Sequence, residues 1–105
     1  MNSKDYERMN KYLDWYEDLL TKKQREIMNS YYREDFSLSE IAENLDITRS
    51  AVSDLIRRVT KTMEEYEAKL KLVEKFQIRS SYYDELIKIG SSEVKEVVQK
   101  LYENE

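Results

Sequence analysis

The sequence predicts an all-α protein, and three observations carry this prediction. Helix breakers are nearly absent, because the 105 residues include no proline and a single glycine, Gly90. Apolar residues recur at three- and four-residue intervals over long stretches. Two segments place Ser or Thr three residues before Glu or Gln, a pattern that begins helices. The 40% hydrophobic content, with nine tyrosines, is enough for a core despite 38% charged residues.

The first two helices are indicated by an apolar stripe and by a capping box. We expect the first helix over residues 4–19. The second begins after Thr21, whose hydroxyl and the Gln24 side chain can each bind the other's backbone amide, and ends near Tyr32. The expected buried residues are Tyr6, Met9, Leu13, Tyr16 and Leu20 in the first helix and Ile27, Met28 and Tyr31 in the second.

Residues 37–58, SLSEIAENLDITRSAVSDLIRR, predict a helix-turn-helix. A second capping box at Ser37–Glu40 starts a short third helix, and Thr48 is the expected N-cap of a fourth. The turn between them requires a left-handed residue at Asp46, a conformation that aspartate tolerates better than most residues. The positions expected to hold the two helices together are Ile41, Ala42, Leu45, Ile47, Val52 and Ile56.

The fourth helix is predicted to run unbroken from Arg49 to Phe76, about 42 Å at 1.5 Å per residue. Its apolar positions alternate spacings of four and three, which is a heptad seam. Two interpretations stay open: the seam is core for the other helices, or part of it pairs in a homodimer that spaces two recognition helices about 34 Å apart. The seam consists of Val52, Ile56, Val59, Met63, Tyr66, Leu70 and Val73.

These elements suggest a division of the chain after the long helix. Residues 1–76 form a helix-turn-helix domain with an extended last helix, and residues 77–105 form a C-terminal extension that packs on it or on a partner chain. The extension is expected to hold two short helices, at about 80–89 and 92–103. Gly90 is the expected C-cap of the first, and Ser91 or Ser92 the N-cap of the second.

The candidate binding residues lie on the outward side of the fourth helix, which in a helix-turn-helix enters a major groove. Residues 48–62 contain four basic residues and one acidic residue, a net charge of +3 in a chain of net charge −4. Arginine can pair with guanine, and serine and threonine are adaptable donors. The expected nucleic-acid-binding residues are Thr48, Arg49, Ser50, Ser53, Arg57, Arg58 and Lys61, with Lys22, Lys23 and Arg25 as further phosphate contacts.

Two residues of this helix count against DNA binding. Asp54 places a negative charge in the middle of the expected groove face, where it repels phosphate unless it accepts from a cytosine amine. Leu55 stands where a polar residue would be normal, and it is interpreted either as extra core contact or as a protein-contact position. The basic side chains themselves have an ordinary alternative, a solvated helix face.

Composition argues against catalysis. Cysteine and histidine are both absent, which removes thiolate metal sites, disulfides and the usual general base. The sequence has no glycine-rich phosphate loop and no metal-ligand spacing among its acidic residues. We expect no enzyme activity, no cofactor, no metal and no small-molecule substrate. No apolar stretch approaches the ~18 residues of a membrane span, so we expect a cytoplasmic protein without membrane contact.

The run from Met9 to about Phe76 resembles the YlxM family of bacterial proteins, whose helix-turn-helix is similar to region 4 of sigma factors. The resemblance is carried by LLTKKQ, YYREDFSLSEIAE, TRSAV and EEYEAKL, which occur in this order. It implies an all-α fold with a sigma region 4-like helix-turn-helix and an association with the signal recognition particle pathway. Asp46 departs from the usual Gly or Asn of the turn, while Ser53 and Leu55 stand where an aromatic and a polar residue are expected.

Two functions remain open from the sequence. The first is a DNA-binding regulatory or accessory protein, with DNA favoured over RNA, which works as a homodimer and takes part in transcription regulation or in the signal recognition particle pathway. The second is a protein-interaction or RNA-binding module of that pathway without a specific DNA target.

Overall fold

The structure, a computed structural model, describes residues 3–105, and side chains from Asp5 onward. All regular elements in this range are helical, which confirms the all-α prediction. The chain divides into two compact units, Met1–Leu70 and Lys71–Glu105. None of the described helices has the length and apolarity that crossing a membrane requires.

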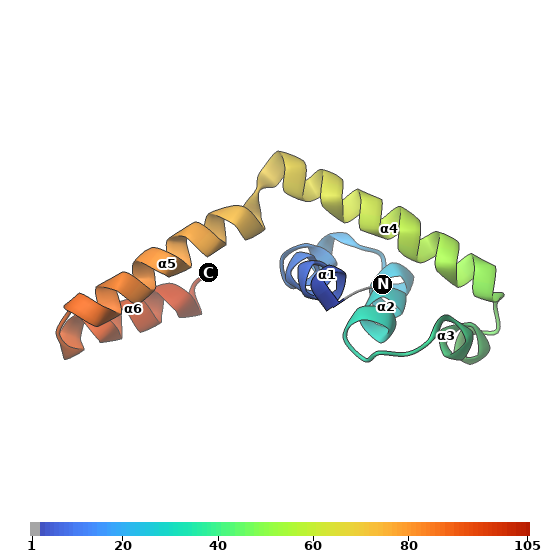
Figure 1. Cartoon of the computed structure of the whole chain (residues 1–105), viewed down its shortest axis with the longest axis horizontal. Helices are drawn as coiled ribbons and strands as arrows, with labels where there is room; N and C mark the ends of the chain where they lie inside the picture. Colours follow the sequence, from blue (N-terminus) through green and yellow to red (C-terminus); the bar gives the residue numbers. More distant parts are fainter. Residues whose placement is uncertain (1–2) are drawn as a thin grey trace. The chain divides into compact units, whose positions relative to one another are not determined.

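The first unit contains α1 (Ser3–Tyr16), a 3-10 turn η1 (Glu17–Leu19), α2 (Lys22–Tyr32), α3 (Leu38–Leu45) and α4 (Arg49–Leu70). Figure 1 shows α1, α2 and α3 on one side of α4, and each of them contacts α4. The first helix therefore ends earlier than expected, because the chain tightens into η1 before Leu20 turns extended. Leu20 is still buried, as the apolar stripe predicted.

Local hydrogen bonds set the helix starts where the sequence placed them. Thr21 Oγ1 accepts from the Gln24 amide at 3.2 Å, and Gln24 Oε1 accepts from the Thr21 amide at 2.9 Å. The same reciprocal pair joins Ser37 and Glu40, at 3.1 Å in both directions. Both capping boxes are thus confirmed, and each satisfies two backbone amides that a helix start leaves unpaired.

The helix-turn-helix turn is closed by a left-handed residue. Asp46 has φ 54° and ψ 47°, as predicted. Its amide donates to the Glu43 carbonyl at 3.3 Å, and the Ile47 amide donates to the Ala42 carbonyl at 3.0 Å, the two bonds of a Schellman motif. Ala42 is buried, and α3 packs against α4.

The first unit's core follows the predicted stripes with three exceptions, the first of which is Tyr6, which is half-buried and not buried. Tyr32 is 4% exposed and Tyr31 is half-buried, so the buried tyrosine of α2 is the neighbour of the expected one. Leu45 is 39% exposed and was wrongly placed in the core, since it belongs to the last turn of α3. The fully or nearly fully buried side chains are Met9, Leu13, Tyr16, Ile27, Met28, Ile41, Val52, Val59 and Met63.

The unbroken long helix to Phe76 is wrong. Helix α4 ends at Leu70, because Lys71 adopts the left-handed conformation (φ 55°) that no α-helix can contain. Val52, Ile56, Val59 and Met63 of the predicted seam are buried against α1, α2 and α3, so this part of the seam is core within one chain. Val73 belongs instead to the second unit.

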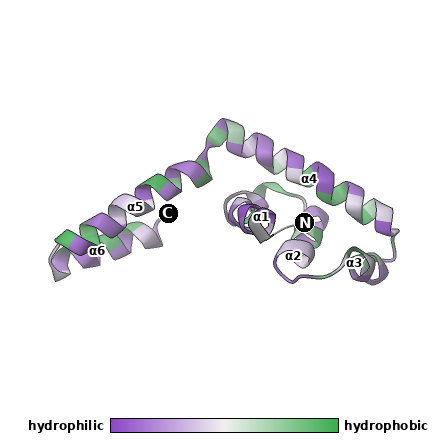
Figure 2. Ribbon diagram, in the orientation of Figure 1, coloured by the Kyte–Doolittle hydropathy of each residue, from purple (hydrophilic) through white to green (hydrophobic). Residues whose placement is uncertain are grey.

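The second unit is a pair of adjacent helices, α5 (Leu72–Ile89) and α6 (Ser92–Glu103). Helix α5 is longer than the expected 80–89, because it begins directly after Lys71. Gly90 follows α5 with an extended backbone. Glycine is required there because the position is crowded, and a Cβ would lie 2.5 Å from Val94 Cγ1. Ser91 caps α6 through the Val94 amide. Figure 2 shows hydrophobic residues recurring along α4 and α5 between hydrophilic ones.

Candidate nucleic-acid interface

The exposed side of α4 carries a stripe of polar side chains. Ser50, Asp54, Arg57 and Lys61 follow one another at spacings of four, three and four, so they share one face of the helix. All four are exposed, and they lie opposite the buried residues Val52, Ile56, Val59 and Met63. We call Ser50, Asp54, Arg57 and Lys61 the outer stripe.

Thr48 serves the backbone at the start of α4. Its Oγ1 accepts from the Ala51 amide at 3.1 Å, which confirms the predicted N-cap. The same oxygen lies 3.3 Å from Ser50 Oγ. The two hydroxyls and Arg49 therefore gather at the first turn of α4, where unpaired amides also favour an anion.

Arg57 is already engaged by a carboxylate. Its Nη2 donates to Asp54 Oδ1 at 2.6 Å, in an ion pair between residues three apart whose side chains are 73% and 56% exposed. Such a pair in water contributes at most about 1 kcal/mol, so a phosphate can displace the carboxylate. Asp54 thus restrains Arg57, which the sequence predicted to enter the major groove of DNA. Its carboxylate would also repel a phosphate.

Arg58 points away from the outer stripe. It follows Arg57 by one residue, which rotates it by about 100° around the helix. Its Nε donates to the Asp54 carbonyl at 3.4 Å, so it lies back along α4. Arg57 and Lys61 share a face, whereas Arg58 reaches phosphates only on the other flank of the helix.

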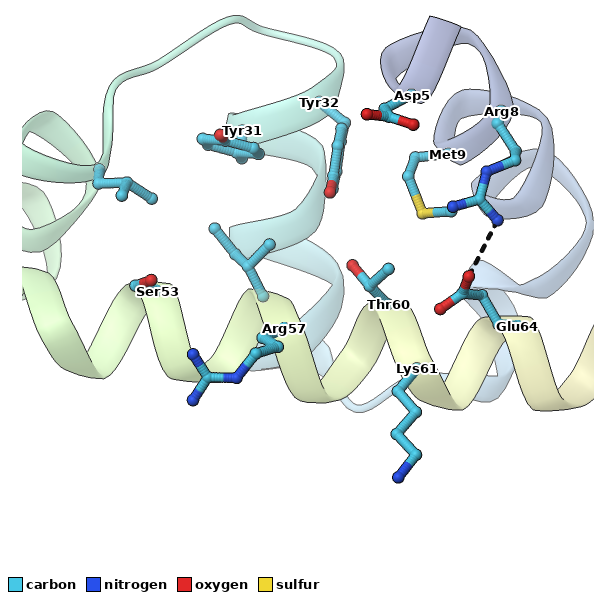
Figure 3. A pocket seen from close by; sticks show the side chains of 12 residues that line it. Asp5, Arg8, Met9, Tyr31, Tyr32, Ser53, Arg57, Thr60, Lys61 and Glu64 are labelled. Atoms are coloured by element: carbon cyan, nitrogen blue, oxygen red, sulfur yellow. Dashed lines mark hydrogen bonds and ion pairs between the residues drawn. The ribbon is translucent and has the colours of Figure 1, made fainter. Parts of the chain in front are cut away.

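A groove beside the outer stripe is formed mainly by α1, α2 and α4, and Leu38 of α3 and the stems of Arg57 and Lys61 also line it. It has a volume of about 550 Å³, and Ser53, Thr60 and Glu64 lie along its α4 wall. In Figure 3, Thr60 and Glu64 lie on the side of α4 toward α1 and α2, while the charged ends of Arg57 and Lys61 point away. Ser53 therefore belongs to the groove more than to the outer stripe.

The far wall of the groove consists of side chains from α1 and α2. Arg8 Nη1 pairs with Glu64 Oε2 at 3.0 Å and joins α1 to α4 across one end of the groove (Figure 3). Tyr31 and Tyr32 stand edge to face, with ring centroids 4.9 Å apart. Burial raises the pKa of Tyr32.

Sequence reasoning missed this groove. Arg8, Tyr31 and Thr60 come from three helices, and only the packing of those helices brings them together. The one available signal was on α4, where Ser53, Arg57, Thr60 and Glu64 recur at spacings of four, three and four.

The basic residues of α2 form a separate group at its first turn. Lys22 is paired loosely with Glu26, at 4.0 Å. Arg25 lies near Glu17 and helps to lower the pKa of that carboxyl, after the larger effect of the Arg33 hydrogen bond. The interactions described for this group are with carboxylates of α2 and η1, and not with the outer stripe.

The groups on this surface are suited to recognition. The described residues hold no group of three or more carboxylates that could bind a metal ion. What the exposed side of α4 offers is cationic and hydroxyl donors, which suit phosphate oxygens and the acceptor edges of bases.

Comparison with known proteins agrees with this arrangement. Residues 3–104 match the family model UPF0122, described as "Putative helix-turn-helix protein, YlxM / p13 like". A UPF0122 protein of Shouchella clausii is 51% identical over 86 residues, which cover 82% of this chain and 79% of that protein. YlxM of Bacillus subtilis is 46% identical over 92 residues, covering 86% of this chain and 84% of YlxM. The chain therefore belongs to the UPF0122 family of YlxM-like helix-turn-helix proteins.

Proposed function

We propose that the protein binds nucleic acid, DNA in preference to RNA, through the exposed side of α4, and that it acts as a regulatory or accessory factor and not as a catalyst. The observation that carries this proposal is the difference between the two faces of α4. Its inner face is buried in the core, while Ser50, Arg57 and Lys61 are exposed and carry hydrogen-bond donors. A cytoplasmic homodimer with two recognition helices would read two half-sites.

The local charge sets the affinity that we expect. Four basic residues and Asp54 on residues 48–62 give few phosphate contacts, and the rest of the chain is acidic. Since phosphate contacts supply most of the affinity for DNA, one copy should bind weakly and with a shallow salt dependence. Binding by a dimer doubles the contacts without any new residue.

The test is a fluorescence anisotropy titration of duplex DNA and of structured RNA at several salt concentrations. Arg57→Ala with Lys61→Ala should weaken binding and reduce the salt slope by about two, because each lost phosphate contact removes about 0.9. Lys95→Ala with Lys100→Ala removes the same charge from α6 and should change the slope by much less. If neither nucleic acid binds at low salt, the proposal fails.

A second candidate is a protein-interaction or RNA-binding module of the signal recognition particle pathway. The observation in its favour is the Asp54–Arg57 ion pair, which reduces the free positive charge of the outer stripe. Native purification with and without nuclease separates the two functions. Partners that survive nuclease favour the interaction module, and partners that disappear with it favour nucleic acid.

A further inference from the structure

The second unit leaves most of its apolar side chains uncovered. Of residues 71–105, all of which the structure describes, only Val73 and Val98 are buried. A unit of this size rarely buries enough surface to be stable without a metal, a disulfide or association with another chain. The chain has no cysteine, and residues 71–105 hold no cluster of metal ligands, so association is the remaining route. The large side chains left exposed are Ile78, Tyr82, Leu86 and Ile89 on α5 and Val97 and Leu101 on α6.

The exposed residues of α5 form one stripe. Ile78, Tyr82, Leu86 and Ile89 are separated by four, four and three residues, which places them on one face of the helix. We call these four residues the α5 stripe. Lys75 precedes Ile78 by three residues and continues the same face.

A different face of α5 holds α6. The ring of Tyr102 packs edge to face on Tyr83 and Phe76, with ring centroids 4.9 Å and 6.4 Å apart. The Tyr102 hydroxyl donates to Asp84 Oδ1 at 2.8 Å. Contact with α6 therefore leaves the α5 stripe free along most of its length.

The stripe continues onto α6 at one end of the pair. Leu86 lines an apolar groove of about 260 Å³ together with Val97 and Leu101. Six apolar side chains that are 40% to 76% exposed then form one surface. They present on the order of 600 Å², most of the about 800 Å² per partner that a standard interface buries.

We propose that this surface binds its own counterpart in a second copy of the chain, with the two α5 helices antiparallel and Tyr82 near the twofold axis. This inference rests on the proposed function, in which the protein is a homodimer, and it assigns an interface to that dimer. The part of the heptad seam from Val52 to Met63 cannot form a dimer interface, because its apolar residues are buried inside the first unit. The α5 stripe is an apolar surface that remains exposed.

Charge determines the direction of the two helices. Lys75 and Ile89 lie at equal distances in sequence on either side of Tyr82. In the antiparallel pair each Lys75 lies opposite the C-terminal end of the partner's α5, where unpaired carbonyls favour a cation. In a parallel pair the two copies of Lys75 would face each other, and so would the two copies of Glu85. The antiparallel pair avoids both repulsions.

The first test is the oligomeric state of the full chain, measured by sedimentation over a range of concentrations. We expect a dimer, and Tyr82→Glu should raise its dissociation constant by about 100-fold or more, because a central aromatic is lost and two carboxylates meet at the axis. Gln77→Glu adds the same charge to an exposed position off the stripe and should change the constant by about twofold at most. A monomer at every concentration, or equal effects of the two variants, would overturn the proposal.

The second test needs no disruption of the interface. Because the chain has no cysteine, one introduced cysteine can form a disulfide only between two copies. Tyr82→Cys should oxidise readily to a covalent dimer, whereas Ile89→Cys should not, since antiparallel helices hold those positions about 21 Å apart. A mixture of Lys75→Cys and Ile89→Cys chains should give the mixed dimer. Ready oxidation of Ile89→Cys alone would refute the antiparallel arrangement.

Failure of this inference and failure of the proposed function give different results. A monomer that binds DNA with the salt slope of Arg57 and Lys61 contacts refutes the interface and leaves the function intact. A dimer that depends on Tyr82 and binds no nucleic acid supports the interface and refutes the function.

Discussion

Replacing Asp54 with asparagine should strengthen nucleic-acid binding. The substitution keeps the size of the side chain and removes the carboxylate that holds Arg57 Nη2 at 2.6 Å. It therefore releases a guanidinium for a phosphate and removes a negative charge from the outer stripe. Both changes act in the same direction on affinity.

The magnitude can be worked from the exposure of the pair. Breaking an exposed ion pair costs at most about 1 kcal/mol, and the Asp54→Asn chain no longer has to break it. Repulsion between a carboxylate and a phosphate about 7 Å apart in water is about 0.6 kcal/mol. Their sum is at most about 1.6 kcal/mol, which corresponds to binding that is tighter by up to about fifteenfold. One additional phosphate contact should steepen the salt slope by about 0.9.

The assay is the same anisotropy titration, with Asp18→Asn as the control. Asp18 lies on η1 and is exposed, so its replacement changes the net charge equally without altering α4. Asp54→Asn should bind more tightly than the control at low salt, and the gain should shrink as salt rises. If Asp54→Asn binds no better than Asp18→Asn, or binds a target sequence more weakly, then Asp54 is not a restraint on Arg57 and the reasoning is refuted.

Three further predictions concern stability. Met63→Ala should cost about 2–5 kcal/mol in urea unfolding, because Met63 is fully buried; a cost below about 1 kcal/mol would mean that the core lies elsewhere. Gly90→Ala should lower the protection of α5 and α6 in hydrogen exchange, since the new Cβ would lie 2.5 Å from Val94 Cγ1, and unchanged protection would contradict this geometry. The Arg33 hydrogen bond lowers the pKa of Glu17 below its ordinary value of 4.5, so its contribution is present above pH 4.5 and is lost as the pH falls through the folded-state pKa. Glu17→Gln should therefore lose less stability between neutral and acid pH, and an unchanged pH profile would argue against the pair.

The sequence predicted most of the first unit because its signals are local. Both capping boxes, the N-cap at Thr48 and the left-handed Asp46 depend on residues at most five positions apart. The geometry of such interactions depends on residues that are neighbours in the sequence, and not on how the helices pack. The spacing of apolar residues then identified the faces that α1 and α4 bury.

The end of α4 could not be predicted from the same signals. The break occurs at Lys71, a residue with no preference for the left-handed conformation, and the apolar spacing continues across it. The spacing of apolar residues does not reveal a single residue whose backbone adopts the left-handed conformation. The candidate site shows a related limit. Spacing placed Arg57 on the exposed face, but the groove with Tyr31 and Arg8 depends on how three helices pack.

The outer stripe of α4 has a consequence for how members of such a family can diverge. The hydroxyl of Thr48 caps the start of α4, and the buried residues from Val52 to Met63 hold α4 in the core. The residues that stabilise α4 are therefore different from Ser50, Arg57 and Lys61. Substitutions among these three exposed positions should change stability by about 1 kcal/mol or less. Substitutions at these few exposed positions could therefore change the binding preference, in evolution or by design, without changing the residues that stabilise the fold.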